Sequence, residues 1–182
     1  MPAAFLSLLD RLRPRKRHWR DGAVLFQRGD RVRELHLITS GKVNLMRSQA
    51  DGSTLVLQRA GPGSILAEAS LHSDAYHCDA MASGDADTSS YSKGSLKKLL
   101  FETPGEAELW AGYLAHELQK SRLRSEILSL KTVSQRLDAW IELSGEWPIP
   151  KGKWKFVAYE LGVTPEAFYR ELAVRRRAQH SA

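Results

Sequence analysis

Two patterns of hydrophobic positions divide the chain near Lys93. Before this residue, short apolar segments alternate with polar positions at a period of two, and most of them end at a turn that contains glycine. The segments are 23–27, 35–39, 42–48, 54–60, 78–82 and 86–92. Alternation of this kind, with β-branched residues and Gly/Asp turns, is typical of antiparallel hairpins. The first part of the chain is therefore predicted to close into a barrel or to pack as a sandwich.

After Lys93 the apolar positions follow a helical period. Thr103-Pro104 is expected to start a long helix of about 25 residues, which would span about 37 Å. Its apolar stripes contain Trp110, Tyr113, Leu114, Leu118, Ile127, Leu128 and Leu130. The helix could lie across the barrel and bury one face. We favour a second stripe that pairs with its symmetry mate in a two-fold dimer, although Glu117, Ser121 and Arg124 interrupt it.

The segment 154–177 predicts two short helices joined by a tight turn. Ala158 is small where two helix axes approach, and Gly162 suits a left-handed turn. Thr164 can cap the second helix, and Pro165 can occupy its first position. A shared apolar face is formed by Val157, Leu161, Val163, Phe168 and Leu172.

This pattern describes a helix-turn-helix, although any αα-hairpin is the alternative. The second helix would present Glu166, Tyr169 and Arg170 to the major groove of DNA. The predicted fold class is thus α+β: an antiparallel β domain (1–102), a long dimerisation helix (103–131) and a helix-turn-helix DNA-binding domain (132–182).

Charge supports a nucleic-acid partner. The 182 residues carry a formal net charge of +6. Segment 151–177 holds seven basic residues, among them Arg175, Arg176 and Arg177, against three glutamates. Such a concentration is expected of phosphate contacts.

The remaining composition narrows the class of protein. No apolar run is long enough to span a membrane, and a single cysteine suits a reducing cytoplasm. The sequence contains no nucleophile elbow, P-loop or HExxH motif, so we do not expect an enzyme.

The order of these parts resembles the CRP/FNR family of bacterial transcription regulators. Residues 22–48, GAVLFQRGDRVRELHLITSGKVNLMRS, are similar to the opening strands of that family. LQRAGPGSILAEAS (57–70) resembles the lead into its phosphate-binding cassette, and VSQRLDAWIEL (133–143) resembles the entry to its DNA-binding domain. The resemblance implies that residues 1–102 form an antiparallel β-roll effector domain of the cyclic-nucleotide-binding type. It also implies double-stranded DNA and a second copy of the chain as partners, with RNA polymerase as a further one.

The cassette departs from the pattern of members that bind cyclic nucleotides. The resemblance aligns it with Ala67, Glu68, Ala69 and Ser70, followed by Cys78 and Asp79. Glu68 would hold the ribose, but Cys78 replaces the phosphate arginine and Asp79 replaces a hydroxyl. Ser121 and Arg122 would meet the purine and suit it only in part. A buried phosphate that loses its cation is destabilised by several kcal/mol, so we do not expect cAMP to be the effector.

The segment 72–79 contains residues that could respond to an effector other than cAMP. His72, His77 and Cys78 could bind haem or a metal, and Cys78 could be a redox thiol, although Asp79 would raise its pKa. The interpretation we favour is a buried structural Cys78. The N-terminal cysteines of the iron–sulfur branch of the family are missing.

The DNA-binding end departs from the family as well. The resemblance aligns Pro165 with the first base-reading arginine, while Glu166 and Arg170 are kept. Glu166 would accept from cytosine and Arg170 would donate to guanine. Because the sequence ends at Ala182, the wing that follows this helix in the family is expected to be absent or vestigial. An alternative function is a sensory β-roll module whose C-terminal helices bind a protein partner.

Overall fold

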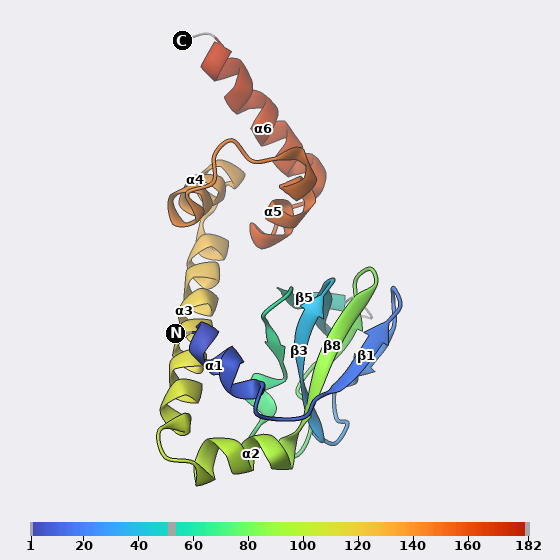
Figure 1. The fold of residues 1–182 in the computed structure, drawn as a ribbon. Coiled ribbons are helices and arrows are strands. Elements are labelled where there is room, and N and C mark those ends of the chain that lie inside the picture. The colour runs from blue at the N-terminus through green and yellow to red at the C-terminus, as the bar shows by residue number, and fades with distance from the viewer. Residues whose placement is uncertain (1, 51–53, 181–182) are drawn as a thin grey trace. The chain divides into compact units, whose positions relative to one another are not determined.

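The structure is a computed structural model that describes residues 2–50 and 54–180 (Figure 1). The chain divides into two compact units, residues 1–114 and 115–182. The first unit contains two antiparallel sheets with strand orders β1-β8-β3-β6 and β2-β7-β4-β5. The strands are β1 (Arg15–Trp19), β2 (Val24–Phe26), β3 (Glu34–Ser40), β4 (Val43–Ser48), β5 (Thr54–Ala60), β6 (Ile65–Leu66), β7 (Asp79–Ala82) and β8 (Ala86–Ser92).

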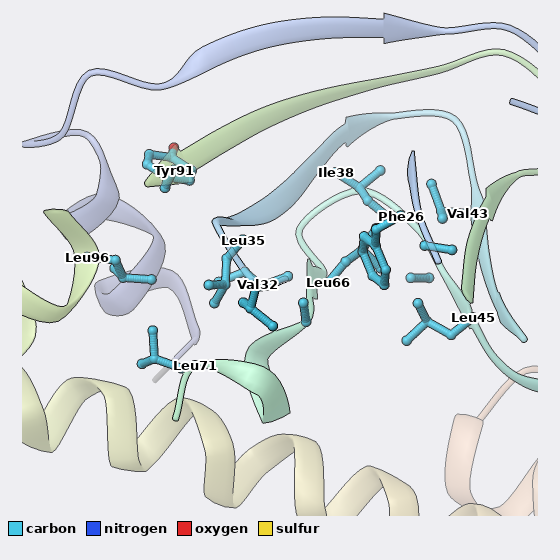
Figure 2. Packing of buried hydrophobic residues seen from close by; sticks show 14 of the residues in the cluster. Phe26, Val32, Leu35, Ile38, Val43, Leu45, Leu66, Leu71, Tyr91 and Leu96 are labelled. Carbon is cyan, nitrogen blue, oxygen red and sulfur yellow. The ribbon is translucent and has the colours of Figure 1, made fainter. Parts of the chain in front are cut away.

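The alternation of side chains along the strands builds the core between the sheets. In β4, for example, Val43 and Leu45 are buried whereas Asn44 is half-buried, as expected of a strand with one face on a core. Figure 2 shows the apolar side chains that meet there, which include Phe26, Val32, Leu35, Ile38, Leu66, Leu71, Tyr91 and Leu96. The predicted antiparallel β-roll is therefore confirmed.

Three elements of this unit escaped the sequence analysis. Helix α1 (Pro2–Leu9) buries Phe5 against Trp110 and Tyr113, with ring centroids 5.0 and 5.1 Å apart. Strand β1 consists of the residues RKRHW and pairs with β8 at the edge of its sheet. Strand β6 has two residues. The hydrophobic pattern did not reveal them, because a short helix, a strand rich in cations and a two-residue strand have little periodicity.

The long helix begins later than Thr103-Pro104, which corrects the sequence prediction. Helix α2 (Lys93–Glu102) ends before Thr103, which is extended (φ −107°, ψ 124°). That conformation is the one a residue before proline prefers. Gly105 then adopts a positive φ of 84°, and α3 runs over Glu106–Ser129.

The second unit contains the remaining helices, with bounds α4 (Val133–Ser144), η2 (Lys151–Lys153), α5 (Trp154–Glu160) and α6 (Pro165–His180). A capping box at the start of α4 joins the backbone and side chains of Thr132 and Gln135. The core of this unit is apolar and consists of Ile127, Leu137, Trp140, Ile149, Val157, Ala158, Leu161, Phe168 and Leu172. Among the described residues, no helix is long and apolar enough to cross a membrane.

Candidate DNA-binding helices and effector pocket

The turn between α5 and α6 has the geometry that its sequence predicts. Gly162 adopts a left-handed φ of 63°, and Ala158 is fully buried. The backbone N–H of Ala167 donates to Thr164 Oγ1 at 3.2 Å, which makes Thr164 the N-cap. Pro165 is the first residue of α6. Local chemistry thus sets the angle at which α6 leaves the turn.

The side chains that would read bases lie on the exposed part of α6. Glu166 and Arg170 are exposed and lie one turn apart. Ala173 and Arg177 continue the same exposed face at spacings of three and four residues. Contact between this face and DNA remains a prediction.

Tyr169 is oriented differently from Arg170. Its ring is half-buried and lies 5.4 Å from the ring of Trp154. The guanidinium of Arg176 lies 4.8 Å from the same tryptophan ring, in a cation–π contact. Tyr169 therefore contributes to the packing of α6 on α5, and only Glu166 and Arg170 remain as base-reading candidates on that surface.

Arg175 is engaged inside the unit, which argues against its predicted contact with phosphate. Its guanidinium donates to Asp138 Oδ1 at 2.7 Å, to Glu171 Oε1 at 2.8 Å and to both the carbonyl and the hydroxyl of Ser134 at 3.0 Å. These acceptors raise the pKa of Arg175 against the opposing effect of its burial. Arg175 thus joins α6 to α4. The same network gives the carboxylate of Glu171 a hydrogen-bond donor. The CRP/FNR pattern usually has an apolar residue at this position.

Arg136 is a residue that the sequence analysis did not single out. Its Nε donates to the carbonyl of Leu130 at 2.8 Å, and its Nη1 donates to the carbonyl of Leu161 at 2.9 Å. A longer contact of 3.4 Å reaches the carbonyl of Gly162. One side chain therefore connects the residue after α3 to the turn before α6. A sequence offers no signal for such a contact, because the partners are 25 residues apart.

The cassette of the first unit forms a partly buried bend. Ala67 has a positive φ of 67° and precedes the short 3-10 helix Glu68–Ser70. The hydroxyl of Ser70 lies 3.1 Å from His77 Nδ1. Cys78 is 2% exposed, and burial, reinforced by Glu68, raises the pKa of its thiol to about 11. Because a thiol with this pKa stays protonated at neutral pH, the structural role of Cys78 is favoured over redox chemistry.

A cation on a neighbouring strand, Arg47, lies close to the cassette. Met46 pairs with Asp79 in the antiparallel ladder of β4 and β7, which places Arg47 opposite Cys78. Arg47 Nη2 donates to the carbonyl of His77 at 3.0 Å, and its positive charge lowers the pKa of Cys78. Arg47 Nε is buried and has no hydrogen-bond partner within the described part of the chain.

Asp79 has a different environment from the one the sequence suggested. Its carboxylate accepts a hydrogen bond of 2.8 Å from the backbone N–H of Arg28. Its effect on the pKa of Cys78 is smaller than those of burial, Glu68 and Arg47. The carboxylate of Asp79 thus has a backbone partner at the cassette, where Arg47 is a nearby cation.

The proposed haem or metal ligands do not converge. The ring of His72 packs edge-on against Phe101, with centroids 5.5 Å apart, while His77 faces Ser70. Within residues 2–50 and 54–180, no three His, Cys, Asp or Glu side chains are placed to hold a metal ion. His72, His77 and Cys78 thus belong to no such three-ligand group in the described residues, and haem binding by one or two of them stays a prediction. Ser121 and Arg122 are exposed on α3, and their part in an effector pocket remains a prediction.

Comparisons with known proteins bear on both units. Residues 16–103 match the cyclic nucleotide-binding domain family. A curated relative, the cyclic AMP receptor protein of Thermus thermophilus, is 28% identical over 123 residues. The aligned region is 67% of this chain and 57% of that protein, so the match spans little more than half of the relative's length.

Two solved structures share the fold over most of the chain. FixK2 from Bradyrhizobium japonicum has a TM-score of 0.72 at 17% identity, covering 91% of this chain and 86% of FixK2. The c-di-GMP-responsive global regulator CLP of Xanthomonas campestris has a TM-score of 0.64 at 19% identity, covering 97% of this chain and 93% of CLP. At these identities the likeness concerns the fold.

The matched residues and the shared fold describe the same architecture. The first unit is a β-roll of the cyclic nucleotide-binding type, followed by a helical segment in a CRP-like order. The domain match and the shared fold agree with the resemblance to the CRP/FNR family that the motifs indicated.

Proposed function

We propose that the chain is a transcription regulator that binds a palindromic DNA operator as a homodimer. The observation that carries the proposal is the capped, left-handed turn at Gly162 and Thr164, which presents Glu166 and Arg170 on the exposed side of α6. A second helix of this kind enters the major groove in helix-turn-helix proteins. Carboxylate and guanidinium groups are suited to reading cytosine and guanine edges.

The dimer proposal rests on a stripe of leucine and serine residues along α3. Leu114, Leu118, Ser121, Ser125 and Leu128 follow one another at spacings of four and three residues, which is the repeat of a two-stranded coiled coil. Leu118 and Leu128 are 51% and 37% exposed, although they are apolar. A symmetry mate would cover them and bring two copies of α6 to half-sites about 34 Å apart.

The arrangement of cations supports contacts with the DNA backbone that do not depend on sequence. Arg177 lies on the exposed face that carries Arg170, and Arg176 keeps its charge at the surface beside Trp154. Because Arg175 is bound within the unit, we assign the phosphate contacts to Arg176 and Arg177 rather than to all three arginines.

Selection from a random duplex library tests this function. A dimer that reads DNA through two α6 helices should enrich an inverted repeat with its half-sites one helical turn apart. Enrichment of no symmetric motif would instead favour a β-roll module whose C-terminal helices bind a protein.

A further inference from the structure

A basic hollow lies on the first unit, beside the start of α2. Its volume is about 400 Å³. The residues that line it are Arg31, Val32, Arg33, Asp74, Lys93, Gly94 and Lys97. Four cations and one carboxylate therefore surround a space within the range of small-molecule sites. Glu68 and Cys78 do not line it, so the hollow is distinct from the cassette.

Hydrogen bonds hold the rim of the hollow in place. The backbone N–H of Val32 donates to the carbonyl of Asp74 at 2.8 Å, and the N–H of Lys93 donates to the carbonyl of Arg33 at 2.8 Å. Lys93 Nζ also donates to the carbonyl of Ser73 at 2.6 Å. These bonds fix two loops against the first turn of α2, so the cations project from a defined framework.

Most of the positive charge in the hollow is uncompensated. Asp74 is fully exposed, and its carboxylate lies 4.0 Å from Lys93 Nζ, where solvent screens the attraction. Arg31, Arg33 and Lys97 form no side-chain hydrogen bond or ion pair with the described residues. These three cations thus have no carboxylate partner within ion-pair distance among the described residues.

An adjoining hollow of about 300 Å³ provides a contrast. It shares Arg31 and Arg33 and adds Arg15 and Arg17. There Glu34 pairs with Arg17 at 2.9 Å and with Arg15 at 3.7 Å, so much of the added charge is balanced. The surplus of cations is concentrated at the start of α2.

We propose that the hollow beside α2 binds a small anion with two or more linked phosphate groups. Guanidinium forks and ammonium groups bind phosphate oxygens through charge-assisted hydrogen bonds. The volume and the spread of four cations suit a phosphate chain better than a single phosphate. Phe26 and Tyr76, the aromatic residues of the adjoining hollow, are 5% and 6% exposed and present no stacking face, so the phosphate chain is what the site recognises.

Calorimetry of the full chain with inorganic tripolyphosphate tests the proposal. We compare the wild type, a variant with Arg31→Gln and Lys97→Gln, and the matched control Lys98→Gln. Lys98 neighbours Lys97 on α2 but does not line the hollow. The double variant should bind at least tenfold more weakly, the control should bind like the wild type, and orthophosphate should bind more weakly than tripolyphosphate.

Two further arms separate this site from the other basic surface. Arg170→Ala should leave tripolyphosphate binding unchanged, because Arg170 belongs to α6. Backbone amide shifts in the wild type should move at Gly94 and Asp74 on addition of tripolyphosphate, which tests the site without any variant. Equal binding by the double variant, loss of binding only in Arg170→Ala, or preference for a polyglutamate peptide over tripolyphosphate would overturn the proposal. None of these results would change the proposed DNA-binding function.

Discussion

Leu128 of α3 lies against Gly162 in the turn before α6. A β-carbon built on Gly162 would lie 2.5 Å from Leu128 Cδ2, which is closer than van der Waals contact allows. Gly162 also has a φ of 63°, a conformation that L-residues rarely adopt. The end of the long helix is thereby packed directly onto the turn that orients α6.

This contact predicts a specific difference between two glycines. Gly145 ends α4 with a φ of 66° but has no atom within 4 Å of a built β-carbon. Gly145→Ala should therefore lower the free energy of unfolding by about 1 kcal/mol through backbone strain alone. Gly162→Ala should cost more, because strain and the clash with Leu128 add. Urea denaturation measures both.

A double-mutant cycle isolates the clash. Adding Leu128→Ala should reduce the cost of Gly162→Ala and leave the cost of Gly145→Ala unchanged. Equal losses of unfolding free energy in the two glycine variants would show that the Leu128 side chain moves aside at no energetic cost.

The local features of this unit were accessible from sequence, whereas its long-range contacts were not. The roles of Gly162, Thr164 and Pro165 follow from φ preference and capping chemistry, which act within a few residues. The partners of Arg175 and Arg136 are set by how α4 packs against α5 and α6. A cluster of arginines looks the same in sequence whether it faces solvent or a buried carboxylate.

The buried His36 predicts a loss of stability in mild acid. Its ring is 2% exposed, lies 2.8 Å from Ser90 Oγ and stacks with Phe26. Burial, with a smaller contribution from Arg17, lowers the pKa of His36 to about 4 from 6.5. Between these values the unfolded chain binds a proton that the folded chain does not, so stability falls as pH decreases through 6.5.

The size of this effect can be measured by denaturation. Between about pH 7.5 and about pH 5.5, the wild type should lose about 1 kcal/mol of unfolding free energy through His36. His36→Gln should be less stable at the higher pH but should lose correspondingly less on acidification. An identical pH dependence in the two proteins would mean that His36 does not titrate on unfolding.

The cassette predicts weak binding of cAMP. Cys78 supplies no charge, and the guanidinium of Arg47 already donates to the carbonyl of His77. Calorimetry at micromolar protein should therefore detect no cAMP binding, and Cys78→Arg should strengthen it at least tenfold. Asp79 is kept in this variant because it caps the backbone of Arg28. Micromolar binding by the wild type would show that Arg47 replaces the missing arginine.

The proximity of Arg47 to the cassette could not be predicted from the sequence alone. The absence of an arginine at position 78 was evident from the aligned motif. Arg47 lies 31 positions earlier, and the pairing of β4 with β7 brings it near Cys78. The register of two strands distant in sequence decides that proximity, and a single sequence does not specify it.

The stripe of α3 predicts a dimer that one charge can disrupt. Leu118→Glu should shift sedimentation toward the monomer, because it would place like charges opposite each other in a two-fold interface. Leu123→Glu is the matched control, since Leu123 is 40% exposed on the opposite face of the same helix. Leu114 is less suitable for this test because it packs against the core of the first unit. Equal sedimentation of both variants as dimers would place the interface elsewhere.

The most direct test of the central claim is titration of a labelled palindromic duplex, taken from the library selection, with three proteins. The wild type should bind as two chains per duplex. Arg170→Ala should lose about 1–3 kcal/mol and become indifferent to one base position in each half-site. Arg177→Gln should weaken binding to all duplexes alike and reduce its salt dependence. Binding by Arg170→Ala with unchanged affinity and unchanged base preference would contradict the assignment of α6 as the recognition helix.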